Sequence, residues 1–413
     1  MSDSALVLRA ALAERVPGYA LPRAFHVEQA IFAREVTTIW RTSWLFAGLS
    51  ASVAKPGEFF TFEMAEDSVI VVRTASGGLE ALHNVCRHRG MRICQRAAGE
   101  ASRWVCPYHQ WTYALDGALE RCGAMEEPLE RSGLGLRKAH VAEAGGLIFV
   151  CLDEPSGPFD EAARALRSAL VPAGLERAKV AHEIDYQVAA NWKLVWHNNR
   201  ECWHCHSGHP QYVLANFDAA PATAQWRELA QSRASEHERA MGDAGGAADE
   251  HAAPGLYAFP APDRWWSANR TPLAPGFVTE SIDGEAVAPL MGRYAEHDVG
   301  TLRIRAVPNF WCHASADHAV LTQLAPRSPH ETAIRVRWLV DRDAVEGVDY
   351  ELERLLPFWQ LTSEQDWDLC ERNHAGVRSP AFVPGPYAPS REYNVAAFDD
   401  WYVRRMFAAN ERA

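Results

Sequence analysis

Two cysteines and two histidines in two short segments have the types and spacing of metal ligands. One residue separates Cys86 from His88, and two residues separate Cys106 from His109. Thiolates and imidazoles together bind zinc or iron, so a tetrahedral zinc site is one interpretation. The single-residue gap is unusual for a zinc finger and suits a cluster in which each segment gives one thiolate to one iron and one imidazole to the other. We therefore favour a Rieske [2Fe–2S] centre.

A second polar group lies within residues 191–210. Asn198, Glu201 and His204 recur every third residue, which would place them on one face of a predicted helix over 191–206. His204 and His209 are five residues apart, and Gly208 can end the helix so that both imidazoles converge. Two histidines and a carboxylate form the facial triad that holds Fe(II) in oxygenases and leaves open positions for O₂.

The other side chains in this segment leave alternatives open. Soft-metal binding by Cys202, Cys205 and His206 is one alternative, and a hydrogen-bonded core position for any of these histidines is another. A Rieske cluster in the same chain favours the iron site, because the cluster needs an electron acceptor.

The carboxylate of the triad must come from elsewhere, and four acids compete between residues 363 and 371. They are Glu364, Asp366, Asp368 and Glu371. Asp366 could instead form a capping box with Ser363 at a helix start. Spacing alone does not choose among them.

Composition excludes several classes of protein. The 413 residues carry 41 Lys and Arg against 53 Asp and Glu, a net charge of −12, which disfavours nucleic acid as a partner. Disorder is excluded by 15 Trp and 16 Phe. We find no run of about 20 apolar residues and no signal peptide, so we expect a cytoplasmic protein without a membrane segment. An odd count of nine cysteines argues against a disulfide framework.

The elements that position these residues divide the chain into three parts. Residues 1–44 are predicted to form a helical segment that packs on the catalytic domain. Residues 45–154 have the short, alternating strands of an all-β domain that carries the first metal site. Residues 155–413 are predicted to form a catalytic domain with an antiparallel sheet flanked by helices. The fold class is therefore α+β, of the helix-grip type.

Periodicity within the third part predicts its main elements. Helices are expected over 159–170 and, as one long helix, over 350–374; strands are expected over 184–188, 301–306, 319–324 and 332–340. Residues 218–254 are rich in Ala, Gly and charge, and they form either a surface insertion or a lid, with 242–246 as their least ordered stretch.

These motifs resemble the α subunit of a Rieske non-haem iron oxygenase over roughly residues 25–405. Within that family the chain is most similar to the glycine betaine monooxygenase and stachydrine demethylase branch. The resemblance is carried by residues 86–90 (CRHRG), 106–113 (CPYHQWTY), 191–210, 338–340 (WLV), 343–350 (DAVEGVDY), 365–366 (QD) and 384–387 (PGPY).

The resemblance implies a role for each candidate residue. The cluster ligands would be Cys86, His88, Cys106 and His109, and the mononuclear Fe(II) ligands would be His204, His209 and Asp366. Glu201 would bridge one subunit's Rieske histidine to the iron ligand of its neighbour, which implies a homotrimer. Asn198 is a further catalytic candidate. The chain departs from the branch at His197, where Glu is usual, and at His374, where Gln is usual.

The implied activity is an oxidative N-demethylation. Electrons from NAD(P)H would arrive through a separate flavin and iron–sulfur reductase, because the sequence lacks a glycine-rich dinucleotide fingerprint. With O₂, the enzyme would hydroxylate an N-methyl group of a betaine-like small molecule and release formaldehyde. Aromatic faces hold quaternary ammonium groups, and the second region offers Trp265, Trp266, Trp311 and Tyr257. Core packing is the favoured interpretation of each one taken singly.

Three alternatives remain open at this stage. One is a ring-hydroxylating or O-demethylating oxygenase that acts on an aromatic acid with the same metal ligands. Another is an electron carrier or sensor with an inert second site. The last is a structural zinc protein. Cys94 lies between the two ligand pairs, but its spacing does not make it a ligand, so we expect an ordinary buried thiol there.

Overall fold

A seven-stranded antiparallel sheet organises the first half of the chain. In this computed structural model, residues 3–123, 130–217, 223–242 and 264–408 are described. The strand order is β1-β10-β9-β4-β3-β2-β5. The strands are β1 (Leu45–Leu49), β2 (Glu58–Met64), β3 (Asp67–Arg73), β4 (Leu79–His83), β5 (Ala98–Glu100), β9 (Lys138–Ala144) and β10 (Leu147–Cys151).

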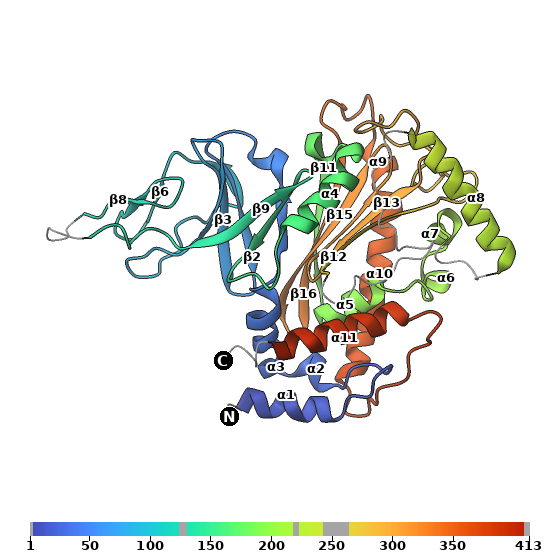
Figure 1. Cartoon of the computed structure of the whole chain (residues 1–413), viewed down its shortest axis with the longest axis horizontal. Coiled ribbons are helices and arrows are strands. Elements are labelled where there is room, and N and C mark those ends of the chain that lie inside the picture. The colour runs from blue at the N-terminus through green and yellow to red at the C-terminus, as the bar shows by residue number, and fades with distance from the viewer. Residues whose placement is uncertain (1–2, 124–129, 218–222, 243–263, 409–413) are drawn as a thin grey trace.

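The apolar runs explain why these strands form. Residues 69–72 of β3 and all of β10 are buried, as expected for β-branched and aromatic side chains in the centre of a sheet. A smaller sheet extends from this one and contains β6 (Trp104–Val105), β7 (Thr112–Tyr113) and β8 (Leu119–Arg121). In Figure 1 this extension forms the tip of the molecule farthest from the helices.

A six-stranded antiparallel sheet organises the second half, in the order β11-β16-β15-β14-β13-β12. Its strands are β11 (Ala178–Val188), β12 (Trp266–Thr271), β13 (Thr301–Ala306), β14 (Phe310–Ala314), β15 (Ala319–Ser328) and β16 (Glu331–Asp341). Alternate residues of β13 and β14, such as Ile304 and Cys312, join an apolar cluster with α4 (Asp160–Ala173). The opposite face packs against α5 (Trp192–Asn199) and α10 (Pro357–Arg378) (Figure 1).

The N-terminal helices pack against the C-terminal helix and α5. They are α1 (Asp3–Ala13), α2 (Ala24–Val27) and α3 (Gln29–Glu35), followed by a π-helical turn over Val36–Trp40, and α11 covers Tyr393–Ala408. Glu35, fully buried, accepts hydrogen bonds from Lys193 Nζ at 2.6 Å and Tyr402 OH at 2.6 Å. A buried carboxylate needs such partners, so this network fixes how the chain ends meet α5.

The predicted strands are confirmed, but two predicted helices are wrong in extent. The helix expected over 191–206 ends at Asn199, and α6 (Cys205–Gly208) and α7 (Pro210–Ala215) are separate turns. The helix expected over 350–374 is divided into α9 (Leu352–Leu355) and α10, because Pro357 lacks the N–H needed to continue α9 and suits the first position of α10.

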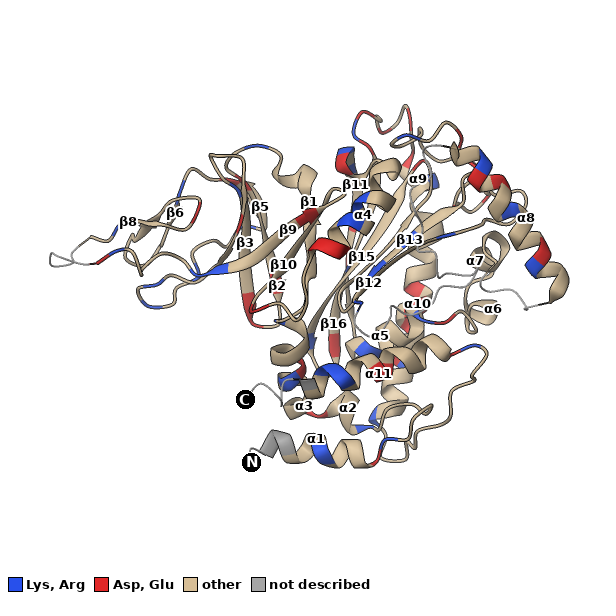
Figure 2. Ribbon diagram, viewed as in Figure 1, with Lys and Arg blue, Asp and Glu red and all other residues tan. Residues whose placement is uncertain are grey.

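Part of the predicted surface insertion is helical. Within 218–254, residues Ala224–Met241 form α8, which carries charges of both signs along its length (Figure 2). The stretches 218–222 and 243–263, which include Tyr257 and most of 242–246, lie outside the described residues. Among the helices of the described ranges, we find none long and apolar enough to cross a membrane.

Candidate active site

Two matched loops at the tip of the first sheet carry Cys86, His88, Cys106 and His109. Cys86 N donates to Met91 O at 2.8 Å, and Cys106 N donates to Trp111 O at 2.8 Å. Each loop is closed by a residue with left-handed φ, which is Gly90 (+78°) in one loop and Gln110 (+57°) in the other. Each of these residues donates its N–H to the carbonyl of its cysteine, so the two loops present their ligand candidates in the same way.

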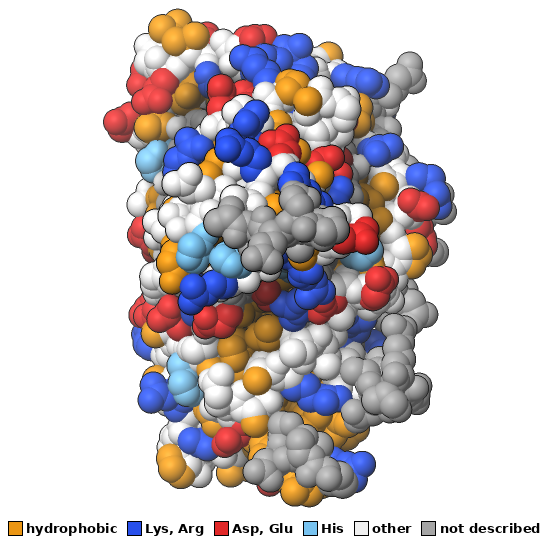
Figure 3. Space-filling view, turned by 90° about the vertical axis from the view of Figure 1, so that its left-hand side faces the viewer, with side chains coloured by type: hydrophobic (Ala, Val, Ile, Leu, Met, Phe, Trp, Pro, Cys, Tyr) orange, Lys and Arg blue, Asp and Glu red, His pale blue; other side chains and the backbone are white. Residues whose placement is uncertain are grey.

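The cysteines are buried, whereas the histidines lie toward the surface. Cys86 is 2% exposed, its Sγ lies 3.2 Å from Tyr113 OH, and burial raises the pKa of this thiol. The rings of His88 and His109 are 4.7 Å apart, and His88 stacks on Trp111. Figure 3, which views the molecule from this end, shows histidine and basic side chains together near the centre of the face.

This arrangement suits a cluster with two sulfur and two nitrogen ligands. His88 Nδ1 is buried and makes no hydrogen bond within the described part of the chain. A buried ring nitrogen without a hydrogen-bond partner is costly unless it binds something else, such as a metal ion. The donor set and this nitrogen fit a Rieske [2Fe–2S] cluster.

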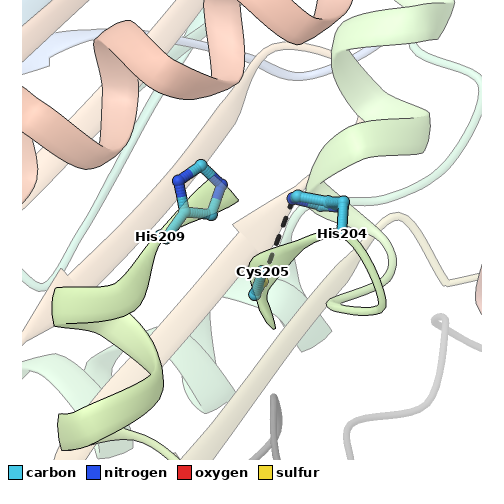
Figure 4. Close-up of side chains that lie close together, drawn as sticks. All are labelled: His204, Cys205 and His209. Atoms are coloured by element: carbon cyan, nitrogen blue, oxygen red, sulfur yellow. Dashed lines mark hydrogen bonds between the residues drawn. The ribbon is translucent and has the colours of Figure 1, made fainter. Parts of the chain in front are cut away.

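Three more candidates converge between the second sheet and α10. Asp366 Oδ1 lies 2.8 Å from His209 Nε2 and 3.3 Å from His204 Nε2. Two ligands about 2.1 Å from one metal ion, at right angles, are about 3 Å apart. These spacings therefore fit a facial triad around one ion. Figure 4 shows the two imidazoles near each other, on either side of α6.

The structure distinguishes among the four acids of residues 363–371, because Asp366 contacts both histidines. The other three have partners elsewhere: Glu364 accepts from Gln360, Asp368 pairs with Arg372, and Glu371 accepts from Ala189 N. The capping-box interpretation of Asp366 is wrong, since Ser363 and Asp366 both lie inside α10.

The charges around the triad are coupled. Burial alone would raise the pKa of Asp366, but the hydrogen bonds with His204 and His209 hold it below its usual value. Burial opposes the charged form of His204, yet Asp366 and Glu201 together raise its pKa to about 10. A cation placed between these side chains would replace the proton that they now share.

Glu201 and Gln365 orient the two histidines from behind. Glu201 Oε1 lies 2.5 Å from His204 Nδ1, and Gln365 Oε1 lies 2.8 Å from His209 Nδ1. Hydrogen bonds of this kind set the tautomer that leaves Nε2 available to a metal. Asn198 Nδ2 lies 3.3 Å from His204 Nε2, on the side of the triad itself.

The segment between α5 and α6 differs from the prediction. Asn198 is the last but one residue of α5, whereas Glu201 and His204 follow that helix, so the three do not form a stripe on one helical face. Cys202 and Cys205 form a disulfide. Cys205 Sγ lies 3.9 Å from His204 Nε2 (Figure 4), but a disulfide sulfur is not a thiolate, which excludes the soft-metal interpretation in this state. His206 is exposed and lies outside this pair.

A small cavity adjoins the triad, with a volume of about 50 Å³. Its described lining includes aromatic side chains from three elements. They are Trp311 on β14, Trp359 and Trp367 on α10, and Tyr212 on α7. Trp311 is thus the one aromatic candidate from the sequence that lines this cavity, since Trp265 and Trp266 pack in the cluster on the other face of the sheet and Tyr257 lies outside the described residues.

The two departures from the branch lie elsewhere. His197 Nε2 is 2.7 Å from Asp399 Oδ1, and Tyr387 OH donates to the other oxygen of that carboxylate. His374 is buried, and its Nε2 lies 3.1 Å from His330 Nδ1. Burial, together with neighbouring charges, lowers the pKa of His374 to about 4. Neither is among the described residues that line the cavity. Cys94 is a buried free thiol, as expected.

Several lining residues were missed by sequence reasoning. Arg305, His313 and Thr322 occupy alternate positions of β13, β14 and β15 that face α10. Polar residues that alternate with apolar ones on a strand usually indicate a solvated face. The strand pattern therefore does not predict that these three side chains line a cavity inside the domain, which the tertiary structure shows.

Two family models cover most of the chain. The Rieske [2Fe–2S] domain matches residues 43–137, and the catalytic domain of ring-hydroxylating α subunits matches residues 175–408. The oxygenase subunit of glycine betaine monooxygenase from Chromohalobacter salexigens is 37% identical over 96% of this chain and 88% of its own length. Its counterpart from Pseudomonas aeruginosa PAO1 is 38% identical over 96% of this chain and 91% of its own length.

Solved structures show the same fold. A quaternary ammonium Rieske monooxygenase crystallised with an inhibitor superposes with a TM-score of 0.70 at 17% identity, covering 95% of this chain and 96% of the other. Naphthalene 1,2-dioxygenase from Rhodococcus sp. superposes with a TM-score of 0.69 at 19% identity, covering 98% of this chain and 99% of the other.

Proposed function

Because this chain belongs to the Rieske non-haem iron monooxygenases of the ring-hydroxylating α-subunit family, we propose that it hydroxylates an N-methyl group of a betaine-like quaternary ammonium compound and releases formaldehyde. The family's cofactors are a [2Fe–2S] cluster and a mononuclear iron. Its substrates are small molecules, and a reductase is the electron donor that an oxygenase subunit needs. The residues proposed to hold the cofactors are those described above.

The observation that carries this proposal is the aromatic cavity beside the triad. Trp311, Trp359 and Trp367 present indole rings to a space next to Asp366. Indole faces attract quaternary ammonium cations, which have no N–H to donate and therefore depend on such contacts.

The chain's own residues would position the substrate and exclude water. When bound, the cluster supplies single electrons and the mononuclear iron supplies the site at which O₂ is activated. His204, His209 and Asp366 would hold that iron, while Glu201 keeps His204 in the required tautomer. The aromatic walls would hold the cationic head so that one N-methyl group faces the triad.

The proposed reaction is a hydroxylation of the methyl group followed by release of formaldehyde. One oxygen atom of O₂ inserts into a methyl C–H bond, and the other leaves as water with two electrons and two protons. The hydroxymethyl group on nitrogen then loses its hydroxyl proton as the C–N bond breaks, which gives formaldehyde and the N-demethylated amine. The electrons would come from NAD(P)H through a separate flavin and iron–sulfur reductase.

We also propose a homotrimer in which clusters and mononuclear sites of different subunits face each other. His109 is exposed at the tip, and Glu201 is half-buried beside the 56% exposed Trp203. In that assembly Glu201 would link a neighbour's Rieske histidine to His204. Light scattering coupled to size-exclusion chromatography tests this directly, and a monomer of full activity would contradict it.

A single-turnover assay tests the activity without the reductase. The purified protein is reduced chemically, the reductant is removed, and O₂ is added with each of a panel of betaines and N-methylated amino acids. Formaldehyde from one or a few of them is the expected result. Reoxidation of the cluster with aromatic acids, and no formaldehyde from any N-methyl compound, would overturn the proposal in favour of the aromatic-acid alternative.

A further inference from the structure

A sulfur atom lies beside the two histidines of the triad. One donor atom from each of His204, Cys205 and His209 lies within 4.8 Å of the other two (Figure 4). Cys205 is 3% exposed, and its Sγ is 3.9 Å from His204 Nε2. That ring nitrogen is also the one that faces Asp366. The sulfur is therefore next to the atom of His204 that would bind a metal ion.

The spacing of this sulfur suits a fourth ligand. In a tetrahedral zinc site, a sulfur about 2.3 Å and a nitrogen about 2.1 Å from the ion are about 3.6 Å apart. The Sγ of Cys205 is thus close to the required position. The 3.3 Å between His204 Nε2 and Asp366 Oδ1 fits the same geometry, in which a nitrogen and an oxygen ligand are about 3.4 Å apart. The 2.8 Å contact of Asp366 with His209 would widen when an ion replaces the shared proton.

The disulfide keeps this sulfur from binding a metal ion. Cys205 is bonded to Cys202, and the ligand of a metal ion is a thiolate rather than a disulfide sulfur. Two electrons and two protons from a dithiol would convert the bond into two thiols, while the dithiol becomes a disulfide itself. Cys202 is half-buried and lines the cavity beside the triad, so the bond is within reach of a small reductant.

The freed thiol would change the metal preference of the triad. Three ligands from His204, His209 and Asp366 leave positions open, as O₂ activation requires. A thiolate from Cys205 would close the site in the manner of a structural zinc site, and soft thiolate ligands select zinc over iron(II). Zinc binding would release the thiol proton. Because zinc does not change its oxidation state, a triad filled with zinc could not accept an electron from the cluster.

We propose that Cys205 is a metal ligand in the reduced state of the Cys202–Cys205 pair, and that reduction converts the open triad into a closed zinc site of His204, Cys205, His209 and Asp366. The disulfide then keeps the triad selective for iron. The proposal rests on the metal-binding part of the proposed function and is independent of the substrate.

Zinc K-edge X-ray absorption tests the proposal, because it reports the ligands of zinc alone and the cluster iron does not interfere. The mononuclear metal is removed with a weak chelator, and one equivalent of zinc per chain is added before or after anaerobic treatment with dithiothreitol and its removal. We expect only nitrogen and oxygen ligands in the disulfide form, and one sulfur at about 2.3 Å in the reduced form. Competition with a chromophoric chelator should show zinc bound at least about tenfold more tightly after reduction.

Two single variants separate this role from simple bracing of the segment. Cys202→Ser leaves Cys205 as a thiol and should show the zinc–sulfur bond without any reductant. Cys205→Ser should show no sulfur in either state, and its zinc affinity should not respond to the dithiol. A disulfide that only braces the segment would make the two variants behave alike. Cys370→Ser removes another buried thiol, on α10 after Asp366, and should keep the zinc–sulfur bond of the reduced wild type.

Two results would overturn the inference. One is a reduced wild type, with unchanged cluster absorbance, whose zinc has only nitrogen and oxygen ligands. The other is a reduced Cys205→Ser variant that still shows a zinc–sulfur bond. Both leave the proposed function intact if the disulfide form retains one mononuclear iron per chain and releases formaldehyde. A triad that binds neither iron nor zinc in either state would overturn the inference and the proposed function together.

Discussion

The two metal centres are built in opposite ways. The four candidate cluster ligands lie within residues 86–109, on two loops whose own backbone hydrogen bonds orient them. The triad joins His209 to Asp366, which are 157 positions apart in the chain. At the cluster site His109 is exposed and His88 is half-buried, whereas His209 is 1% exposed. The first site is a local structure at the surface, and the second exists only where α10 packs against the segment after α5.

This difference predicts different responses to damage. A local site should depend on its own ligands and loops and be insensitive to changes in the helices. A site assembled by tertiary packing should depend on ligands, on the orienting groups behind them and on the segment that connects them. Each variant below should therefore affect one centre and spare the other.

The largest effect is expected from Cys86→Ala. Losing one buried thiolate should abolish the cluster, its red-brown colour and all turnover, while the triad still binds one iron per chain. Visible absorbance and iron analysis measure this. Cys94→Ala, which removes a buried thiol nearby, is the matched control and should keep the colour. A red-brown Cys86→Ala protein would refute the ligand assignment.

Asp366→Ala should break the other centre. Without the carboxylate that faces both imidazoles, the mononuclear iron should be lost and turnover with it, while the cluster spectrum is unchanged. Asp368→Ala, two positions along the same helix, removes an exposed acid paired with Arg372 and should retain activity. Turnover by Asp366→Ala would mean that another acid supplies the ligand.

Glu201→Gln should slow the enzyme without removing either metal. The amide can still accept a hydrogen bond from His204 Nδ1, but it lacks the negative charge that supports electron transfer and the basicity of the imidazole. We expect turnover to fall roughly 10- to 100-fold. Stopped-flow absorbance of the reduced cluster should show slower reoxidation with substrate and O₂. Glu364→Gln, on α10, is the control, and equal rates in both variants would rule out the positioning role.

The double variant Cys202→Ser, Cys205→Ser should weaken retention of the mononuclear iron by a few-fold. The disulfide joins the two ends of the segment that carries His204, so its removal should loosen this ligand and weaken retention of the mononuclear iron. Iron content after dialysis against a weak chelator measures this, with Cys122→Ser as the control. Cluster absorbance should not change, and an unchanged iron content would show that the packing of α6 suffices.

The smallest effect is expected from Tyr113→Phe. Arg87 N donates to the Tyr113 oxygen, so the phenol is free to donate to Cys86 Sγ. Removing a donor to a cluster sulfur should lower the reduction potential, because the hydrogen bond favours the more negative, reduced state. Potentiometric titration followed by circular dichroism tests the shift, with Tyr108→Phe as the control. A raised potential would contradict the assigned hydrogen bond.

The cluster loops could be predicted from sequence because their ligands are close in the chain. The pairs Cys86–His88 and Cys106–His109 need only two tight turns to face each other, and Gly90 supplies one of the left-handed positions. Gln110 supplies the other, and no residue preference indicates that a glutamine would adopt it.

The triad was only partly predictable. The convergence of His204 and His209 follows from a local turn, but the helical stripe of Asn198, Glu201 and His204 was wrong because α5 ends at Asn199. Spacing did not choose among the four acids, and only the resemblance to the family named Asp366. The Cys202–Cys205 disulfide and the place of Arg305 in the cavity wall were not predicted. The contacts of Asp366 and Arg305 depend on which side of α10, or of β13, meets another element.

The sequence by itself determined the α+β fold class, the strands and the chemical types of both metal sites, because periodicity and short spacings act over a few residues. Tertiary structure alone decided that Asp366 rather than its neighbours faces the histidines, and that Trp311 shares a cavity with Trp359 and Trp367. Those contacts join residues distant in the chain. Their formation depends on how the helices pack on the sheet, which local patterns do not encode.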